Sequence, residues 1–346
     1  MLDSTPSALL SRANPLILSH RGALGDFLVS WPALRALVLA RPRARTLWAG
    51  RAEYHFFLEP LGAEKAGPEL TRAVDRAYGN DPSGLPGSAV LVRFALAPGR
   101  TFPEHLQILS IYSVDPESFD PPGLIQAETL ARWGVPLPPG ALADFQGFFG
   151  HVPPGPEESR ALAACAGEAA LLFPGAGHPA KAWPLVQYFE LAQRLPELGL
   201  CPVFVLGPAE VERGMDARGW PDEWPTVRPQ SLSDLTGLLN RAALVLGNDS
   251  GPLHLAGMLR RPAVALFGPS SRRQWGPPGV LALARDMSRD QACRPCTRTT
   301  VALDCAEPVC LSEMKVEEVL EALTRIRTAS QSGGHTQKPG SSRKEE

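Results

Sequence analysis

The chain has 346 residues, of which 44% are hydrophobic and 20% charged, and its formal net charge is −2 at pH 7. This length predicts two domains with full cores, and the near-neutral charge argues against a nucleic-acid partner. No stretch approaches the roughly 20 apolar residues of a membrane span. The amino terminus, MLDSTPSALLSRANP, has neither a basic leader nor a sustained apolar core. We therefore expect no signal peptide and a cytoplasmic protein.

The first half of the chain begins with a strand, a glycine loop and a helix. The segment Leu16–His20 predicts a first strand, Gly22 and Gly25 lie in the loop, and a helix is expected over 26–40. Pro32 lies inside this helix and predicts a kink or a restart. Further predicted elements are strands over 46–49, 88–94 and 107–114 and a helix over 126–133.

Several arginines gather around the end of this first helix. Such a group is typical either of a solvated helix end or of contact with anionic lipid at the inner face of a membrane. The arginines are Arg35, Arg41, Arg43, Arg45 and Arg51.

The segment HVPPGP at 151–156 is the predicted linker, because three prolines in six residues do not form a core element. After it, strands and helices alternate, which predicts a parallel, doubly wound α/β sheet. We expect an amino-terminal domain over 1–150, a carboxyl-terminal domain over 151–327, and a polar, glycine-rich, disordered tail over 328–346. The predicted strands of the second domain cover 169–173, 201–206, 242–246 and 262–267, and its helices cover 184–195, 208–218 and 232–240.

The stretch 242–270, AALVLGNDSGPLHLAGMLRRPAVALFGPS, predicts a strand, a helix and a second strand. Polar residues follow the first strand, where open α/β sheets bind ligands. Gly251 would let a ligand approach the backbone, and Asp249 and His254 could address hydroxyls or phosphate oxygens. The alternative is that Asp249 or Ser250 only caps the helix and that His254 only packs.

A second glycine loop, FPGAGHPAKAW at 173–183, follows another predicted strand. Gly175 and Gly177 would expose backbone N–H groups, and Lys181 would add an ammonium, which suits a phosphate or diphosphate. The alternative is an ordinary turn. The sequence contains no G-x-x-x-x-G-K-[ST] phosphate loop.

Five segments, in this order, resemble glycosyltransferase family 9, the ADP-heptose:lipopolysaccharide heptosyltransferase family. The resemblance implies a GT-B fold, in which two Rossmann-like domains face each other across a cleft. It also implies a nucleotide-sugar donor held by the carboxyl-terminal domain and inversion at the anomeric carbon without a catalytic metal or cofactor. The segments are HRGALGDFLVSWPALRAL, FPGAGHPAKAWP, VFVLGPAE, LSDLTGLLNRAALVLGNDSGPLHLAG and VALFGPS, about a third of the chain.

The resemblance also implies roles for individual residues. Asp26 looks like the general base, although an aspartate that begins a helix is also an ordinary N-cap. Lys181 looks like the contact to the donor phosphates, and Glu210 or Glu212 looks like the nucleoside contact. The residues that look like the sugar and phosphate loop are Asp249, Ser250, Gly251 and His254.

The chain has six cysteines, too few for a disulfide scaffold in a protein of this size. Cys165 and Cys201 are predicted to be core residues. The other four form a C-x2-C-x8-C-x4-C pattern, and similar clusters occur in the family that the chain resembles. They predict a structural Zn or Fe site, reduced thiols or disulfides. They are Cys293, Cys296, Cys305 and Cys310.

The expected function is transfer of a sugar, heptose from ADP-heptose, to a lipid-linked or lipopolysaccharide-core acceptor, with a possible peripheral contact at the inner membrane. One alternative is a nucleotide-sugar epimerase on the same scaffold, which would convert the donor with no acceptor present. The other is a non-catalytic nucleotide-sugar-binding protein, which has no need of a carboxylate at position 26.

Overall fold

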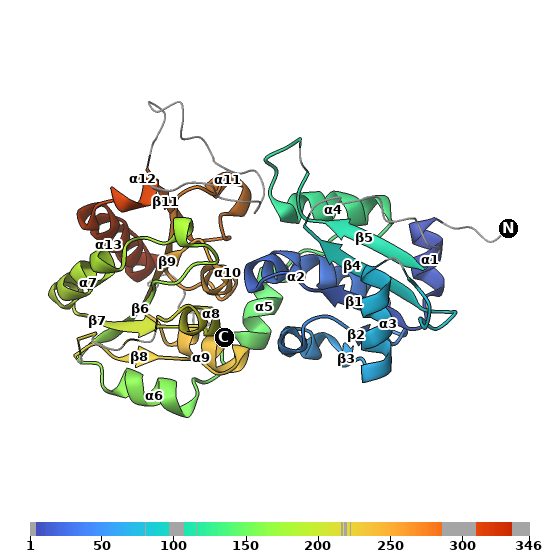
Figure 1. The fold of residues 1–346 in the computed structure, drawn as a ribbon, viewed down its shortest axis with the longest axis horizontal. Helices are drawn as coiled ribbons and strands as arrows, with labels where there is room; N and C mark the ends of the chain where they lie inside the picture. Colours follow the sequence, from blue (N-terminus) through green and yellow to red (C-terminus); the bar gives the residue numbers. More distant parts are fainter. Residues whose placement is uncertain are drawn as a thin grey trace, which may run out of the picture.

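The computed structural model describes residues 5–79, 81–96, 107–115, 117–215, 217, 220–221, 223–285 and 309–333. They form two parallel β-sheets flanked by helices. Figure 1 shows the sheets side by side, with α2 (Leu24–Leu39), α5 (Ala141–Phe149) and α10 (Gly251–Met258) between them. The predicted α/β fold of two Rossmann-like sheets is confirmed.

The amino-terminal sheet has the strand order β3-β2-β1-β4-β5, and each adjacent pair is parallel. All five residues of the central strand β1 are buried, including the polar Ser19 and His20 at its carboxyl end. The strands are β1 (Leu16–His20), β2 (Thr46–Trp48), β3 (Glu64–Lys65), β4 (Val90–Ala95) and β5 (Ile108–Tyr112). The remaining helices of this half are α1 (Pro6–Arg12), η1 (Ala52–Phe57), η2 (Glu59–Leu61), α3 (Pro68–Tyr78) and α4 (Pro122–Arg132).

The carboxyl-terminal sheet has the order β11-β10-β9-β6-β7-β8, again parallel throughout. Its strands are β6 (Glu168–Phe173), β7 (Leu200–Val205), β8 (Thr226–Val227), β9 (Leu244–Asn248), β10 (Ala263–Phe267) and β11 (Leu281–Ala284). Its longer helices are α6 (Pro156–Ala163), α7 (Leu185–Arg194), α9 (Leu232–Asn240), α10 and α13 (Val316–Gly333). The short ones are η3 (Pro179–Lys181), η4 (Leu195–Leu198), α8 (Pro208–Glu212), α11 (Arg272–Trp275) and α12 (Val309–Ser312).

In both sheets the order in which the chain adds strands reverses beside the first strand. In the amino-terminal sheet the chain moves outward from β1 to β3 and then returns to β4 on the other side of β1. In the carboxyl-terminal sheet it moves from β6 to β8 and returns to β9 beside β6. At such a switch point the loops leaving the two strands diverge, and the crevice between them is where open α/β sheets bind ligands.

Two predicted helices and the predicted tail differ from the structure. Helix α2 continues through Pro32 without a restart, because buried residues on both sides of the proline hold it against the core. Helix α8 ends at Glu212, well before the predicted 218. Disorder from residue 328 is wrong for 328–333, since α13 extends to Gly333 and Val319 and Leu323 anchor it in the core. The rest of the predicted tail lies outside the described residues.

The arginine group near the end of α2 is not a single surface patch. The Arg35 side chain is only 7% exposed and pairs with Asp144 on α5, so it is part of the interior. Arg45 pairs with Glu64 on β3. In the part of the chain that the structure describes, no helix is both long and apolar enough to cross a bilayer.

Cys165 and Cys201 form a disulfide, which corrects the prediction of two separate core cysteines. Cys165 follows α6 and Cys201 lies in β7, and the fold brings their Cα atoms to 5.6 Å, within the range that a disulfide requires. The two residues are 36 positions apart, so this contact depends on the tertiary fold and has no local signal in the sequence.

Candidate functional site

The predicted site residues converge where the carboxyl ends of β1, β6 and β9 face each other across the two halves of the chain. Asp26 lies in the first turn of α2, after β1, Lys181 follows β6, and Asp249 follows β9. The Lys181 and Asp249 charges both act on the pKa of Asp26. Three residues that are far apart in the sequence therefore belong to one electrostatic cluster at the switch points of both sheets.

Asp26 is partly buried, and its carboxylate Oδ2 accepts a hydrogen bond from the Ala23 backbone N–H at 3.1 Å. It therefore caps the helix as well as facing the cluster. Burial raises the pKa of Asp26, the Ala23 bond and Lys181 lower it, and Asp249 raises it. Because burial is the largest of these effects, the carboxylate holds a proton more tightly than an exposed aspartate, as a general base must.

Lys181 and Asp249 form an ion pair with 2.9 Å between Nζ and Oδ2, and their side chains are 17% and 8% exposed. The Ser270 hydroxyl donates a second hydrogen bond to the same Asp249 oxygen at 2.6 Å. Asp249 is thus fixed from two sides, while the Lys181 side chain stays partly exposed. A partly desolvated ammonium at this position can bind a phosphate oxygen strongly.

Asn248, whose side-chain role the sequence did not predict, holds the glycine loop in place. It is fully buried, and its amide N–H groups donate to the carbonyls of Pro174 at 2.9 Å and Gly175 at 3.1 Å. Its Oδ1 accepts from the Trp183 backbone N–H at 2.9 Å. One side chain at the end of β9 therefore fixes both ends of the loop that carries Lys181. A polar residue that ends an apolar strand is a signal that could have found it.

The structure distinguishes the two candidate glutamates. Glu210 lies against the glycine loop, where a Cβ added to Gly175 would come within 2.1 Å of its Oε1. Its Oε2 accepts from the Gly207 N–H at 2.9 Å, whereas Glu212 is exposed. Arg213, which the sequence motifs did not indicate, donates to the carbonyls of Ala176 and Gly177 in the same loop.

His254 and Gly251 join α10 to α2. His254 is 5% exposed and packs beside Gly25, and burial lowers its pKa, so it is neutral near pH 7. A Cβ at Gly251 would lie 2.7 Å from Leu24 Cβ and 3.1 Å from the Gly25 nitrogen. Gly251 therefore lets the two helices meet, a different role from the predicted approach of a ligand. Ser250 is the N-cap of α10, but its hydroxyl donates to the Asn248 carbonyl instead of capping the helix.

The loop before Asp26 is held by two aromatic residues. His20 is buried, and its Nδ1 accepts from the Gly22 N–H at 3.2 Å. The Tyr54 hydroxyl donates to the Gly22 carbonyl at 3.0 Å, and burial raises its pKa to about 12. A Cβ at Gly22 would collide with the His20 ring at 2.8 Å, so this glycine is required for the tight turn that positions Asp26.

Of the four clustered cysteines, Cys310 lies in α12, and Cys293, Cys296 and Cys305 lie outside the described residues. Within the described ranges, no three histidine, cysteine, aspartate or glutamate side chains gather as they would around a metal ion.

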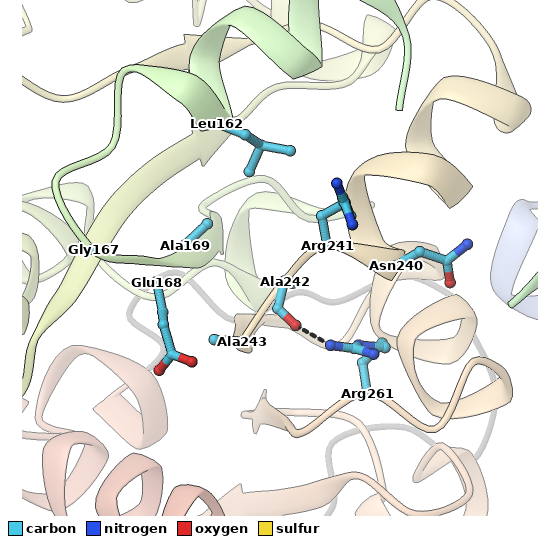
Figure 2. Close-up of a pocket in the computed structure, with 9 residues that line it drawn as sticks. All are labelled: Leu162, Gly167, Glu168, Ala169, Asn240, Arg241, Ala242, Ala243 and Arg261. Atoms are coloured by element: carbon cyan, nitrogen blue, oxygen red, sulfur yellow. Dashed lines mark hydrogen bonds between the residues drawn. The ribbon is translucent and has the colours of Figure 1, made fainter. Parts of the chain in front are cut away.

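A separate pocket of about 390 Å³ lies at the opposite edge of the carboxyl-terminal sheet (Figure 2). It is lined by the amino ends of β6 and β9, away from the switch point. Two of its charged groups already have partners: Arg261 donates to the Ala242 carbonyl, and Glu168 pairs with Arg327.

The carboxyl-terminal half of the chain matches a known family. A family model described as glycosyltransferase family 9 (heptosyltransferase) matches residues 154–307. Lipooligosaccharide heptosyltransferase 2 of Campylobacter jejuni is 33% identical over 85 residues, which cover 25% of this chain and only 26% of that protein. The matched stretch therefore spans about a quarter of this curated relative.

Two solved structures cover nearly the whole chain. A glycosyltransferase family 9 protein from Veillonella parvula superposes with a TM-score of 0.63 at 16% identity, over 92% of this chain and 98% of that one. Escherichia coli heptosyltransferase WaaC with ADP superposes with a TM-score of 0.58 at 17% identity, over 90% and 99%. Residues 154–307 therefore match glycosyltransferase family 9, the heptosyltransferase family, and the chain as a whole shares the fold of solved proteins of that family.

Proposed function

We propose that the chain is an inverting glycosyltransferase that transfers heptose from ADP-heptose to a lipopolysaccharide-core or related glycan acceptor. The observation that carries this proposal is the cluster in which the Asp26 carboxylate lies within electrostatic reach of the Lys181–Asp249 pair. This cluster would supply a partly buried carboxylate as the general base and an ammonium that stabilises the diphosphate leaving group. The heptosyltransferase WaaC, which has a similar fold, was solved with ADP, and this supports an adenine nucleotide in the donor.

In the proposed reaction, Asp26 accepts the proton of the acceptor hydroxyl as its oxygen attacks the anomeric carbon of the donor. The bond to ADP breaks, and Lys181 stabilises the negative charge that develops on the diphosphate. The glycine loop held by Asn248 adds backbone N–H groups to the phosphates, and Glu210 accepts from nucleoside hydroxyls. A single displacement of this kind inverts the configuration at the anomeric carbon.

The proposed reaction needs no cofactor. The four-cysteine segment remains a candidate structural Zn or Fe site, separate from the transfer step. The proposed acceptor is lipid-linked, so a peripheral contact with the inner membrane is part of the same proposal.

Calorimetry and mass spectrometry together test the proposed function. ADP should bind more tightly than UDP or GDP, and ADP-heptose should be consumed only when an acceptor glycan is added. Conversion of the nucleotide sugar without an acceptor would instead indicate an epimerase. Binding with neither conversion nor transfer, across core acceptors of different lengths, would indicate a non-catalytic binder.

A further inference from the structure

The disulfide between Cys165 and Cys201 joins two parts of the chain that are anchored very differently. Cys201 lies in β7, which pairs with β6 on one side and β8 on the other, and every other residue of β7 is buried. Cys165 follows α6 by two residues. Figure 1 shows α6 at the outer edge of the carboxyl-terminal half, beside β8 and α9. The disulfide therefore ties a peripheral helix to a core strand.

Helix α6 has few other attachments. Of its eight residues, all of which the structure describes, only Glu158 is buried, and Ala161 and Leu162 are partly buried against the core. Among the described residues, the side-chain hydrogen bonds of α6 reach no farther than the carbonyls of Pro154 and Pro156. Little apolar surface thus holds the helix in place, and a helix this short is not stable by itself in water.

The one buried side chain of α6 opposes its packing on α9. A Cβ added to Gly155 would lie 2.5 Å from Glu158 Oε2 and 2.6 Å from Asp234 Oδ1, so the two carboxylates face each other across this glycine. Burial raises the pKa of Glu158, a backbone hydrogen bond lowers it, and Asp234 and Glu157 raise it. At neutral pH, the contact between the helices therefore includes repulsion between like charges. The covalent bond at Cys165 supplies attachment that the packing lacks.

The disulfide also lies near the protein surface. Cys165 and Cys201 are both partly exposed, in contrast to the buried residues that follow Cys201 in β7. Exposed disulfides are reduced more readily than those enclosed in a core, because a thiol in solution can reach them.

We propose that the Cys165–Cys201 disulfide is a redox-controlled tether of α6. When the bond is formed, α6 is docked on α9 and β8, and when it is reduced, α6 detaches while the two sheets stay folded. In the reduction, a small-molecule thiolate such as that of glutathione attacks one cysteine sulfur and displaces the other as a thiolate. A second thiolate then displaces the first, so the chain gains two thiols and glutathione leaves as its disulfide.

Contacts of the linker limit how far the change extends. The Asn240 amide donates to the carbonyls of Phe149 at 2.7 Å and Val152 at 3.1 Å. A Cβ added to Gly237 would lie 2.0 Å from the Pro153 carbonyl oxygen, so α9 also touches the linker directly there. Because α9 holds the chain as far as Pro153 without the disulfide, we expect the loss of order to be confined to residues 154–165.

Hydrogen exchange measured by mass spectrometry on the full chain tests the proposal, with oxidised or reduced glutathione at millimolar concentration. Differential alkylation reports the thiols of Cys165 and Cys201 in the same samples. Reduced glutathione should make both cysteines reactive together. Amide exchange over 156–163 should then rise at least about tenfold, whereas exchange in β6 and β7 should stay unchanged.

Two variants separate this disulfide from the other cysteines. Cys165→Ser should show the fast α6 exchange in both glutathione buffers. Cys310→Ser keeps the disulfide and removes one thiol of the four-cysteine segment, so it should respond to glutathione like the wild type. Four results would overturn the proposal: resistance of the disulfide to reduced glutathione, unchanged α6 exchange after its reduction, loss of protection in β6 and β7 together with α6, or a glutathione response of α6 that persists in Cys165→Ser.

Discussion

Asp26 caps its helix and is the proposed general base, and a single substitution can separate the two roles. It accepts a hydrogen bond from Ala23, as a helix cap does, and it faces the Lys181–Asp249 pair, as a base would. Asparagine keeps a side-chain oxygen for the Ala23 N–H, but it cannot take up the proton of the glycan hydroxyl that attacks the donor. We therefore expect Asp26→Asn to lower turnover by at least about a hundredfold with donor affinity unchanged.

Stability provides the control for this variant. Because burial raises the pKa of Asp26, its contribution to stability is present when it is protonated and is lost as the pH rises through the folded pKa. At neutral pH, Asp26→Asn should therefore be at least as stable as the wild type in thermal unfolding. Asp81→Asn, in an exposed loop, is the matched control with normal turnover. Near-normal turnover of Asp26→Asn would show that Asp26 only caps the helix and is not the general base.

Lys181 also has a structural role, because it neutralises the nearly buried Asp249. Lys181→Met should weaken ADP binding about ten- to a hundredfold, since a charge-assisted bond contributes about 1.5 to 3 kcal/mol. It should also lower stability by leaving Asp249 unpaired. The double variant Lys181→Met with Asp249→Asn should recover stability but not ADP affinity. Recovery of both in calorimetry would mean that Lys181 acts only through Asp249.

His20 should make stability depend on pH. Burial lowers its pKa to about 4, from an ordinary value of 6.5, so between these values the unfolded chain binds more protons than the folded one. Stability should fall as the pH falls through this window, by up to about 3 kcal/mol. His20→Asn keeps an acceptor for the Gly22 N–H but does not titrate. Denaturant unfolding of both proteins from pH 7 to pH 4 should show their stability difference shrinking, and a constant difference would contradict the assignment.

At the scale of elements, the contact of α10 with α2 depends on glycine. At Gly251 a methyl group would press on Leu24 and on the Gly25 backbone, neither of which is the end of a flexible side chain. We expect Gly251→Ala to destabilise the chain by about 1 to 3 kcal/mol through overpacking. Gly147→Ala, at an open helical position, should not destabilise it. The urea midpoints of unfolding report the stability of both variants. Equal midpoints would contradict the prediction, because they would show that α2 and α10 can move apart with no loss of stability.

The sequence predicts elements well where the signal is local. Strand β1 has the predicted bounds, and β9 and β10 are close to theirs, because a mostly apolar run followed by a glycine-containing loop or turn suffices to identify a buried strand. The two-residue strands β3 and β8 have no such run and were not predicted. Helix α13 was not predicted, and its last turns were assigned to a disordered tail because their residues are polar, although the core anchors the helix upstream.

At the scale of the whole molecule, the family resemblance named the candidate residues of the site, but it did not name the residues that hold them in place. Lys181, Asp249 and Asp26 could be named from motifs, and the topology brings them together. The bonds of Asn248 to the glycine loop join residues more than 60 positions apart, as does the ion pair of Lys181 with Asp249. Such contacts exist only in the folded sheet, where the loops after β6 and β9 lie side by side, so a local sequence pattern cannot predict them.

The most direct test of the central claim is an assay of heptose transfer from ADP-heptose to lipopolysaccharide core that lacks its heptose residues, with the product examined by NMR. We expect ADP release that depends on the acceptor and a new glycosidic bond whose anomeric configuration is opposite to that of the donor. A product with retained configuration, or donor consumption that is independent of the acceptor, would contradict the account.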